Sequence, residues 1–97
     1  MIRLDQKFQH HSQVVTTELD PSEAVLLHLD NQRFYTLNGT GWLIWKSLGE
    51  DLNLKEIAQK LQQEFDVENG VAEKSVNDLV ANLESEKLVK LSKTNNE

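Results

Sequence analysis

The sequence contains no cysteine, and this absence removes several kinds of chemistry at once. A chain without thiols has no disulfide scaffold, no cysteine nucleophile and no thiolate metal site. Glycines are also few, and Gly39 and Gly41 have neither the spacing nor the lysine of a phosphate-binding loop. No apolar run approaches the roughly 18 residues that a membrane-spanning helix needs. Residues 1–13 lack the apolar segment of a signal peptide, so we expect a cytoplasmic protein.

Basic residues are also few in this sequence. The 97 residues include 10 lysines and arginines against 16 aspartates and glutamates, which gives a formal net charge of -6. Both arginines, Arg3 and Arg33, lie in the N-terminal half of the chain. An acidic chain is repelled by polyanions such as DNA, whereas protein and peptide partners remain compatible with it.

No group of residues in the sequence has the arrangement of a catalytic site. The serines lack the glycine-framed turn that presents a hydrolase nucleophile. The carboxylates Glu50 and Asp51, like Glu84 and Glu86, have no apolar wall beside them that would raise a pKa, so we expect solvated helix faces there. We therefore predict that the protein is not an enzyme.

The three histidines do not form a metal site that is recognisable from the sequence. His10 and His11 are neighbours, and adjacent residues rarely face one ion together, while no third ligand lies near them in the sequence. His28 alternates with the apolar positions of its segment, so we predict that it lies at the surface, where a partner that covered it would make it sensitive to pH. The sequence predicts neither a bound metal nor a cofactor.

Three short segments have the composition of β-strands. Gln13–Leu19 is rich in β-branched residues, and Ala24–Leu29 and Arg33–Leu37 follow it after short polar turns. Turns this short favour an antiparallel meander, which places Arg33–Leu37 at an edge of the sheet. The alternation within the second strand predicts one face of Val25, Leu27 and Leu29 and an opposite face of Leu26 and His28. In the third strand it predicts one face of Tyr35 and Leu37 and an opposite face of Phe34 and Thr36.

Beyond Asn38 the apolar residues repeat every three or four positions, which is typical of amphipathic helices. Asn38 is a suitable N-cap for a first helix that ends near Gly49. Asn53 and Glu56 resemble a capping box at the start of the second helix. The third helix is expected from about Val71 to Lys87. The expected core positions are Trp42, Ile44, Trp45, Leu48, Leu54, Ile57, Ala58, Leu61, Phe65, Ala72, Val76, Leu79, Val80 and Leu83.

Three strands followed by three helices predict an α+β domain. The order resembles a winged helix-turn-helix, with a three-stranded antiparallel sheet followed by a three-helix bundle. We expect this domain to span residues 13–91, after a flexible N-terminal arm at residues 1–12 and before a disordered tail at residues 92–97. Short helices are marginal alone, so each must bury its apolar stripe against the others and against one face of the sheet.

A winged helix also raises the alternative of a DNA-binding transcriptional regulator, in which the third helix would read the bases. The segment Val71–Lys87 argues against this alternative because its acidic residues outnumber its basic ones. The acidic residues are Glu73, Asp78, Glu84 and Glu86, and the basic ones are Lys74 and Lys87. The phosphate field would repel such a helix, and the predicted helices contain no arginine to read guanine.

The strand Arg33–Leu37 is the feature that most suggests a binding site. An exposed edge strand presents unpaired backbone donors and acceptors, and proteins usually protect it with charge or proline. This strand has no proline, and Arg33 is its only charged residue. It is therefore suited to accept an extended peptide as an additional strand. A loop, the N-terminal arm or a second copy of the chain are the alternatives that would cover it.

Three segments together resemble the PqqD-like family. They are VLLHLDNQRFYTLNGTGWLIWKSL from Val25, EIAQKLQQEFDV from Glu56 and SVNDLVANLESEKLVKL from Ser75. The shared pattern is a strand with consecutive leucines, an aromatic-x-Leu-Asn junction at Tyr35, an Ile-Trp helix, and two further helices. The resemblance covers roughly residues 13–91. In place of the aspartate that usually follows the leucines, this chain has His28.

The resemblance implies a recognition element for ribosomally synthesised peptides that are later modified. Such proteins bind the leader segment of the precursor as a strand added to the third strand, with leader side chains in a groove against the third helix. They deliver the precursor to a leader peptidase, a radical S-adenosylmethionine enzyme or a cyclodehydratase, and a stand-alone chain is similar to those of lasso-peptide and pyrroloquinoline quinone pathways. The predicted peptide-binding residues on the strand are Arg33, Phe34, Tyr35, Thr36 and Leu37. Those on the third helix are Ser75, Leu79, Asn82 and Glu86, whose helical spacing places them on one flank, where we expect them to line the groove beside the strand.

Overall fold

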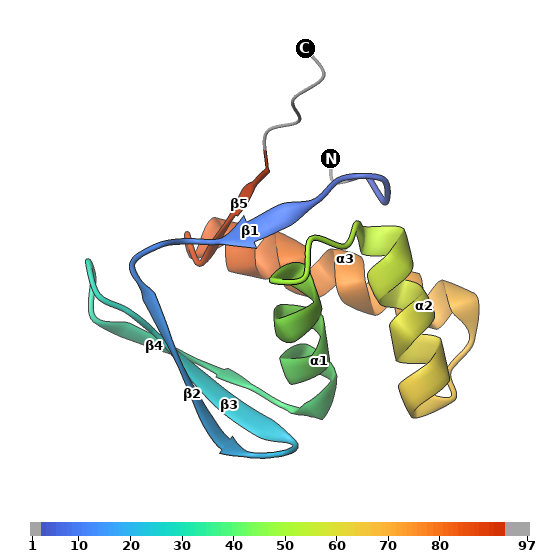
Figure 1. Ribbon diagram of the computed structural model, residues 1–97, viewed down its shortest axis with the longest axis horizontal. Coiled ribbons are helices and arrows are strands. Elements are labelled where there is room, and N and C mark those ends of the chain that lie inside the picture. Colours follow the sequence, from blue (N-terminus) through green and yellow to red (C-terminus); the bar gives the residue numbers. More distant parts are fainter. Residues whose placement is uncertain (1–2, 93–97) are drawn as a thin grey trace.

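A computed structural model describes residues 3–92 of the chain (Figure 1). A three-stranded antiparallel sheet in the order β2-β3-β4 packs beside three helices, and a two-stranded sheet of β1 and β5 joins the two ends of the described chain. The strands are β1 (Phe8–His10), β2 (Val14–Asp20), β3 (Glu23–His28), β4 (Arg33–Leu37) and β5 (Val89–Leu91). The helices are α1 (Gly39–Leu48), α2 (Leu54–Phe65) and α3 (Asn69–Ser85).

This architecture confirms the α+β class and the three-stranded antiparallel sheet that precedes three helices, although β1 adds a further strand before that sheet. It also confirms that β4 lies at an edge of the sheet. Within residues 3–92, no helix combines the length and the apolar character that crossing a membrane requires.

The helix starts follow from the capping residues. Asn38 ends β4 and caps α1 directly, since its Oδ1 accepts a hydrogen bond from the Gly41 N–H at 2.9 Å. Asn53 and Glu56 form the predicted capping box at α2, with both hydrogen bonds at 2.8 Å. α3 begins at Asn69 without a side-chain cap. Because Asn38 serves both β4 and α1, the strand enters the helix with no linker between them.

The tryptophans lie in the core, as their helical spacing predicts. The core fills the space between the inner face of the sheet and the helices, and Trp45 is only 1% exposed. Its indole Nε1–H donates to Thr16 Oγ1 on β2 at 3.1 Å, and its ring stacks on His10 of β1 at 3.6 Å. One side chain of α1 therefore holds both β1 and β2 in place.

The predicted division of β3 into two faces is correct, but the predicted surface position of His28 is wrong. Ala24, Leu26 and His28 face the core, and His28 is 3% exposed rather than at the surface. The sequence gives little contrast here because β3 is apolar on both faces, so alternation alone cannot decide which one is buried. The register with β4 shows which face is inside: Leu26 pairs with Tyr35, and Ala24 pairs with buried Leu37.

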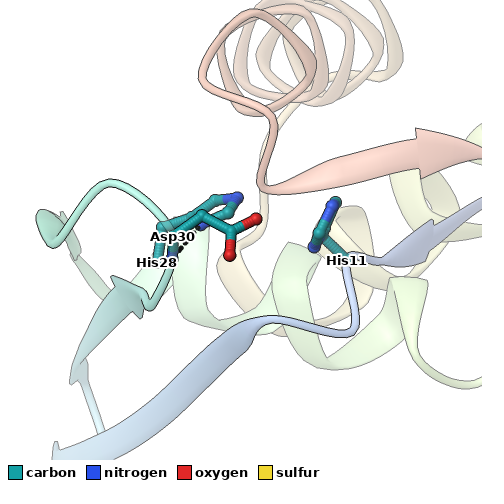
Figure 2. Close-up of side chains that lie close together, drawn as sticks. All are labelled: His11, His28 and Asp30. Carbon is teal, nitrogen blue, oxygen red and sulfur yellow. Dashed lines mark hydrogen bonds between the residues drawn. The ribbon is translucent and has the colours of Figure 1, made fainter.

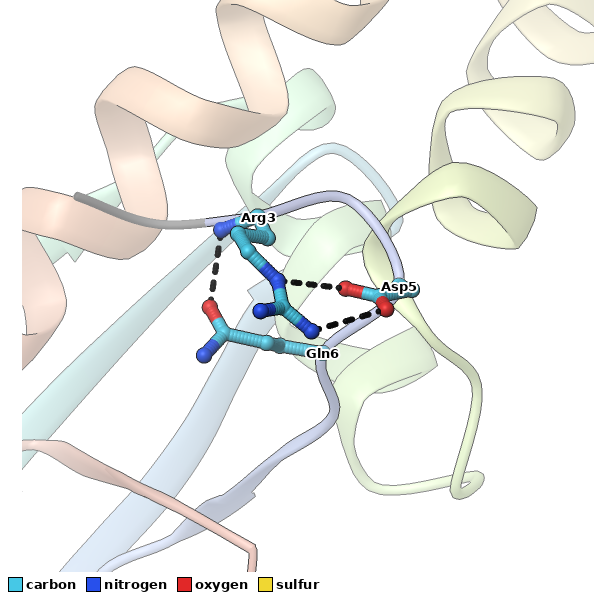
Figure 3. Close-up of polar contacts among 3 residues, drawn as sticks. All are labelled: Arg3, Asp5 and Gln6. Carbon is cyan, nitrogen blue, oxygen red and sulfur yellow. Dashed lines mark hydrogen bonds and ion pairs between the residues drawn. The ribbon is translucent and has the colours of Figure 1, made fainter.

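The N-terminal segment also differs from the predicted loose arm. Phe8 is 2% exposed, and β1 pairs antiparallel with β5. Figure 3 shows the turn before it, in which the Arg3 guanidinium donates twice to the Asp5 carboxylate at 3.0 and 3.2 Å. The Arg3 N–H donates to Gln6 Oε1 at 2.8 Å. A short strand whose partner lies some 80 residues away leaves no local period in the sequence.

The backbone of this segment also supports α2. The Leu4 and Gln6 carbonyls accept hydrogen bonds from the Lys55 and Leu54 N–H groups, at 2.9 and 3.1 Å. These are among the first N–H groups of a helix, which have no partner inside it. Of the predicted disordered tail at residues 92–97, residues 93–97 lie outside the described part of the chain.

Candidate functional site

The hydrogen-bond pattern of the sheet shows which backbone groups of β4 remain free. The Leu29 N–H donates to the Gln13 carbonyl at 2.8 Å, so the backbone groups of Leu29 point toward the β2 side. Successive residues of a strand point their N–H and C=O groups to opposite sides. His28, Leu26 and Ala24 therefore direct theirs toward β4.

The partners of these three residues on β4 are Arg33, Tyr35 and Leu37. The backbone groups of Tyr35 and Leu37 are consequently used within the sheet, and the Arg33 N–H donates to Asn31 Oδ1 at 3.0 Å. Phe34 and Thr36 direct their N–H and C=O groups to the open edge, where residues 3–92 provide no strand to receive them. These two residues are the positions at which an added strand can form hydrogen bonds.

The side chains of β4 divide between two faces. Leu37 is buried and Tyr35 is half-buried, and both point toward the helices. Phe34 points the other way and is 70% exposed, and Thr36 is exposed on the same outward face. The predicted alternation within this strand is correct.

Beside the free edge, a groove separates β4 from α3, and we call it the β4–α3 groove. At one end a hollow of about 330 Å³ is bordered by Tyr35, Thr36 and Leu37 on the strand side and by Leu79 on the helix. Asn38, Gly41 and Glu23 complete this hollow. At the other end Arg33, Phe34 and Tyr35 border a smaller hollow with Glu86 on the helix side. The remaining residues of the smaller hollow are His28, Asn31 and Leu88.

An ion pair crosses the groove. Arg33 Nη1 of β4 lies 3.6 Å from Oε1 of Glu86, the residue that ends α3. Tyr35 borders both hollows, so the pair and the larger hollow lie on either side of one side chain. The Arg33 side chain is largely exposed, and an ion pair of this kind contributes little to stability. It is therefore a contact that a ligand can replace at low cost.

The structure brings together most of the residues that the sequence predicts for the site. All five β4 residues, with Leu79 and Glu86, border one or both hollows. Ser75 is half-buried and Asn82 is exposed, and neither borders a described hollow. Helical spacing put the four α3 residues on one flank, but spacing gives no distance to the strand.

The positions of Asn38 and Gly41 at the larger hollow can each be explained. Asn38 was predicted as a cap, and its place at the end of β4 also puts it in the hollow. A Cβ added to Gly41 would lie 3.2 Å from Leu37 Cδ2, so glycine permits the close approach of α1 to the strand. That contact depends on the tertiary structure, so the sequence alone contains no signal for it.

The adjacent histidines of the sequence point to different places. The His10 Nε2 is 2.8 Å from the Trp45 carbonyl, and its ring lies flat on the Trp45 indole. Burial lowers the pKa of His10, although the hydrogen bond to the Trp45 carbonyl opposes this effect. His10 is therefore a neutral structural residue.

His11 turns instead toward β3 (Figure 2). Its ring lies 4.8 Å from that of His28, and potential ligand atoms of His11, His28 and Asp30 lie within 4.8 Å of one another. The Nδ1 atoms of both rings accept backbone N–H groups, from Gln13 at 3.0 Å and from Asp30 at 3.2 Å. A neutral ring whose Nδ1 accepts carries its proton on Nε2, the nitrogen that a metal would need. The geometry thus favours a structural cluster over a metal site.

The charges of α3 do not favour binding to DNA. Within Asn69–Ser85, Lys74 is the only cation, and its Nζ lies 2.8 Å from the Asp78 carboxylate. The hydrogen bond to Asp78 also raises the pKa of Lys74. Glu73 and Glu84 add further negative charge on the same helix. A reading helix of this composition would be repelled by phosphates.

Comparisons with known proteins identify the family of this chain and two similar structures. Residues 23–89 match the protein-family model described as coenzyme PQQ synthesis protein D (PqqD). The structure is similar to TbiB1 in complex with the TbiA(beta) leader peptide, with a TM-score of 0.78 and 27% identity over 91% of this chain and 99% of that chain. It is also similar to lasso peptide synthetase B1 complexed with the leader peptide, with a TM-score of 0.78 and 26% identity over 86% and 96%. The comparison with curated proteins gave no match.

Proposed function

The chain belongs to the PqqD family, and from this membership we propose that it is a non-catalytic protein that binds the leader segment of a ribosomally synthesised precursor peptide. Both similar structures are complexes with a leader peptide, and the likeness extends over nearly their whole length. The observation that carries the proposal is the free edge of β4 beside an open groove. It presents the two elements that recognition of an extended peptide needs, which are backbone groups and side-chain pockets.

The leader binds as a fourth strand of the sheet, beside β4. Phe34 and Thr36 supply the hydrogen bonds through their N–H and C=O groups, and these bonds do not depend on the leader sequence. A leader residue beside Tyr35 points inward because residues next to each other on adjacent strands share a face. Its side chain enters the larger hollow, where Leu79 and Leu37 favour an apolar residue.

The bound precursor is then presented to a second protein that performs the chemistry. The histidine cluster and the exposed carboxylates of the described residues do not assemble into a nucleophile with its base, so modification or cleavage falls to a partner enzyme. The coverage of the lasso peptide synthetase B1 chain, 96% of its length, favours a lasso-peptide pathway with a leader peptidase as that partner. A radical S-adenosylmethionine enzyme or a cyclodehydratase is the alternative partner.

Amide hydrogen exchange tests strand addition directly. The probe is a synthetic leader peptide, chosen by searching the genes that neighbour the one for this chain for a short precursor, and it is added to isotope-labelled protein. The Phe34 and Thr36 amides should gain protection when the leader is added, because only their N–H groups point to the open edge. The Tyr35 and Leu37 amides should be protected before and after. Protection or shifts confined to α2, with β4 unaffected, would place the binding site elsewhere.

A further inference from the structure

The central positions of the outward face of the sheet hold five apolar side chains and two threonines, and none of these seven is fully buried. They are Val15 and Thr17 on β2, Val25 and Leu27 on β3, and Phe34 and Thr36 on β4, with Leu29 just beyond β3. Val15 is 44% exposed, Leu29 49% and Phe34 70%, although the chain as a whole carries a net charge of -6. In Figure 1 the helices lie beside the other face. The outward face of an antiparallel sheet is usually polar, so this one requires an explanation.

The register arranges part of this face as a row that ends at the free edge. Val15 pairs with Leu27, and Leu27 pairs with Phe34, so the three side chains lie next to one another across the sheet. Leu27 has a neighbour on both sides and is half-buried. Phe34 has one neighbour only and remains the most exposed large apolar residue among the described positions. An added strand would place a fourth residue in this row.

We propose that the leader is recognised on both faces of the sheet, and that Phe34 selects an aromatic or β-branched leader residue on the outward face. The proposal depends on the leader binding proposed above. The residue beside Phe34 is adjacent in sequence to the one that enters the β4–α3 groove, because successive residues of a strand point to opposite faces. The preferred ligand is thus an extended segment with two consecutive apolar residues, one for each face.

The position of Phe34 indicates that the leader strand is what covers this part of the outward face. Its own N–H and C=O face the open edge, so a strand hydrogen-bonded there lies beside the Phe34 ring. Aromatic and β-branched cross-strand pairs are favourable, and such a pair corresponds to about a two- to fivefold change in Kd. A second copy of the chain is the competing occupant, since the uncharged central positions of this face allow two acidic molecules to approach each other.

The test is a selection of random 12-residue peptides displayed on phage, carried out on three full-length proteins. These are the wild type, Phe34→Thr, which keeps the backbone N–H and a β-branched side chain, and the control Val15→Thr. Val15 lies in the same row, two strands from the site of addition. Thermal melts check that all three proteins fold. Sedimentation of each unliganded protein reports on self-association.

The wild type and Val15→Thr should enrich peptides with two adjacent apolar positions. Phe34→Thr should lose the preference at one position and retain it at the other, and its affinity for the enriched peptides should fall about two- to fivefold. An unchanged preference in Phe34→Thr would overturn the inference and leave leader binding intact. A dimer that Phe34→Thr dissociates would assign the face to a second copy and also overturn it. Failure of all three proteins to enrich any peptide would count against the proposed function itself.

Discussion

The sheet has two edges, and they differ in how they treat an approaching strand. At the β2 edge, the Val14 N–H is already bonded to the His11 carbonyl at 3.1 Å. The register of β2 shifts between Glu18 and Asp20, and both carboxylates are exposed there. A used donor, an irregularity and negative charge are established ways of blocking strand addition.

The β4 edge has none of these protections. Its register with β3 is regular over all five residues, and the residues that face the open edge, Phe34 and Thr36, are uncharged. A groove runs beside it, whereas the β2 edge has no comparable feature among the described pockets. The contrast indicates that the open edge is a property of β4 specifically and is not a general consequence of a small sheet.

The largest effect is expected from proline at the open edge. Thr36→Pro removes an edge donor and places a ring where the leader strand would pack, so Kd for the leader should rise about tenfold or more. Glu18→Pro at the β2 edge is the matched control and should leave Kd unchanged. Calorimetry measures both, and thermal melts should show both variants folded. Equal losses of affinity at the two edges would end the distinction between them.

The next effect concerns the wall of the groove. Leu79 is half-buried and borders the larger hollow, so Leu79→Ala should weaken leader binding and lower the free energy of unfolding by about 1–2 kcal/mol, less than for a fully buried leucine. Asn82→Ala, on the same flank but outside the hollow, should have a smaller effect on both. Calorimetry and denaturant unfolding separate the two quantities. If Asn82→Ala weakened binding more than Leu79→Ala, the leader would contact the more exposed side of α3 instead of the larger hollow.

The ion pair across the groove should have a smaller effect. Glu86→Gln removes the partner of Arg33, and because the pair is partly exposed, the free energy of unfolding should change by about 1 kcal/mol or less. Leader affinity should change together with its dependence on salt, since Arg33 becomes available to a leader carboxylate. The exposed pair Lys74–Asp78 provides the control, as Asp78→Asn removes a charge outside both hollows. Identical salt profiles for both variants would argue against a role of Arg33 in binding.

The smallest expected effect is on the loss of stability at low pH. Burial lowers the pKa of His10 in the folded state, so the unfolded chain binds a proton more readily. The stability that neutral His10 contributes is complete above its ordinary pKa of about 6.5 and is lost as the pH falls through the lower folded value. His10→Phe keeps a ring against Trp45 and should reduce this pH dependence in thermal melts. If the slope below pH 6.5 is the same in the variant, another group is responsible.

The helices were predictable because their signals are local. Asn38, Asn53 and Glu56 lie next to the N–H groups that they cap, and an apolar repeat of three or four residues is visible within a single helix. The edge position of β4 followed from turn lengths alone. The two faces of β4 were predicted from the alternation of its residues.

The remaining features depend on contacts between distant segments. β1 pairs with β5 across most of the chain, and buried His28 lies beside the ring of His11, a residue that is distant from it in the sequence. An apolar strand with two similar faces does not show which face is inside. On α3, the side chains that border the groove depend on the rotation of the helix against β4, and helical spacing does not determine that rotation.

The free groups at Phe34 and Thr36 belong to the backbone, and every residue type except proline has both. The hydrogen bonds of an added strand are therefore indifferent to the leader sequence, while preference for one leader over another depends on the side chains of the two faces. Affinity and preference are in this way separable traits. In the proposed binding mode, a change at Leu79 or Phe34 should alter the preferred leader while the backbone hydrogen bonds remain, which makes these two positions targets for engineering leader preference.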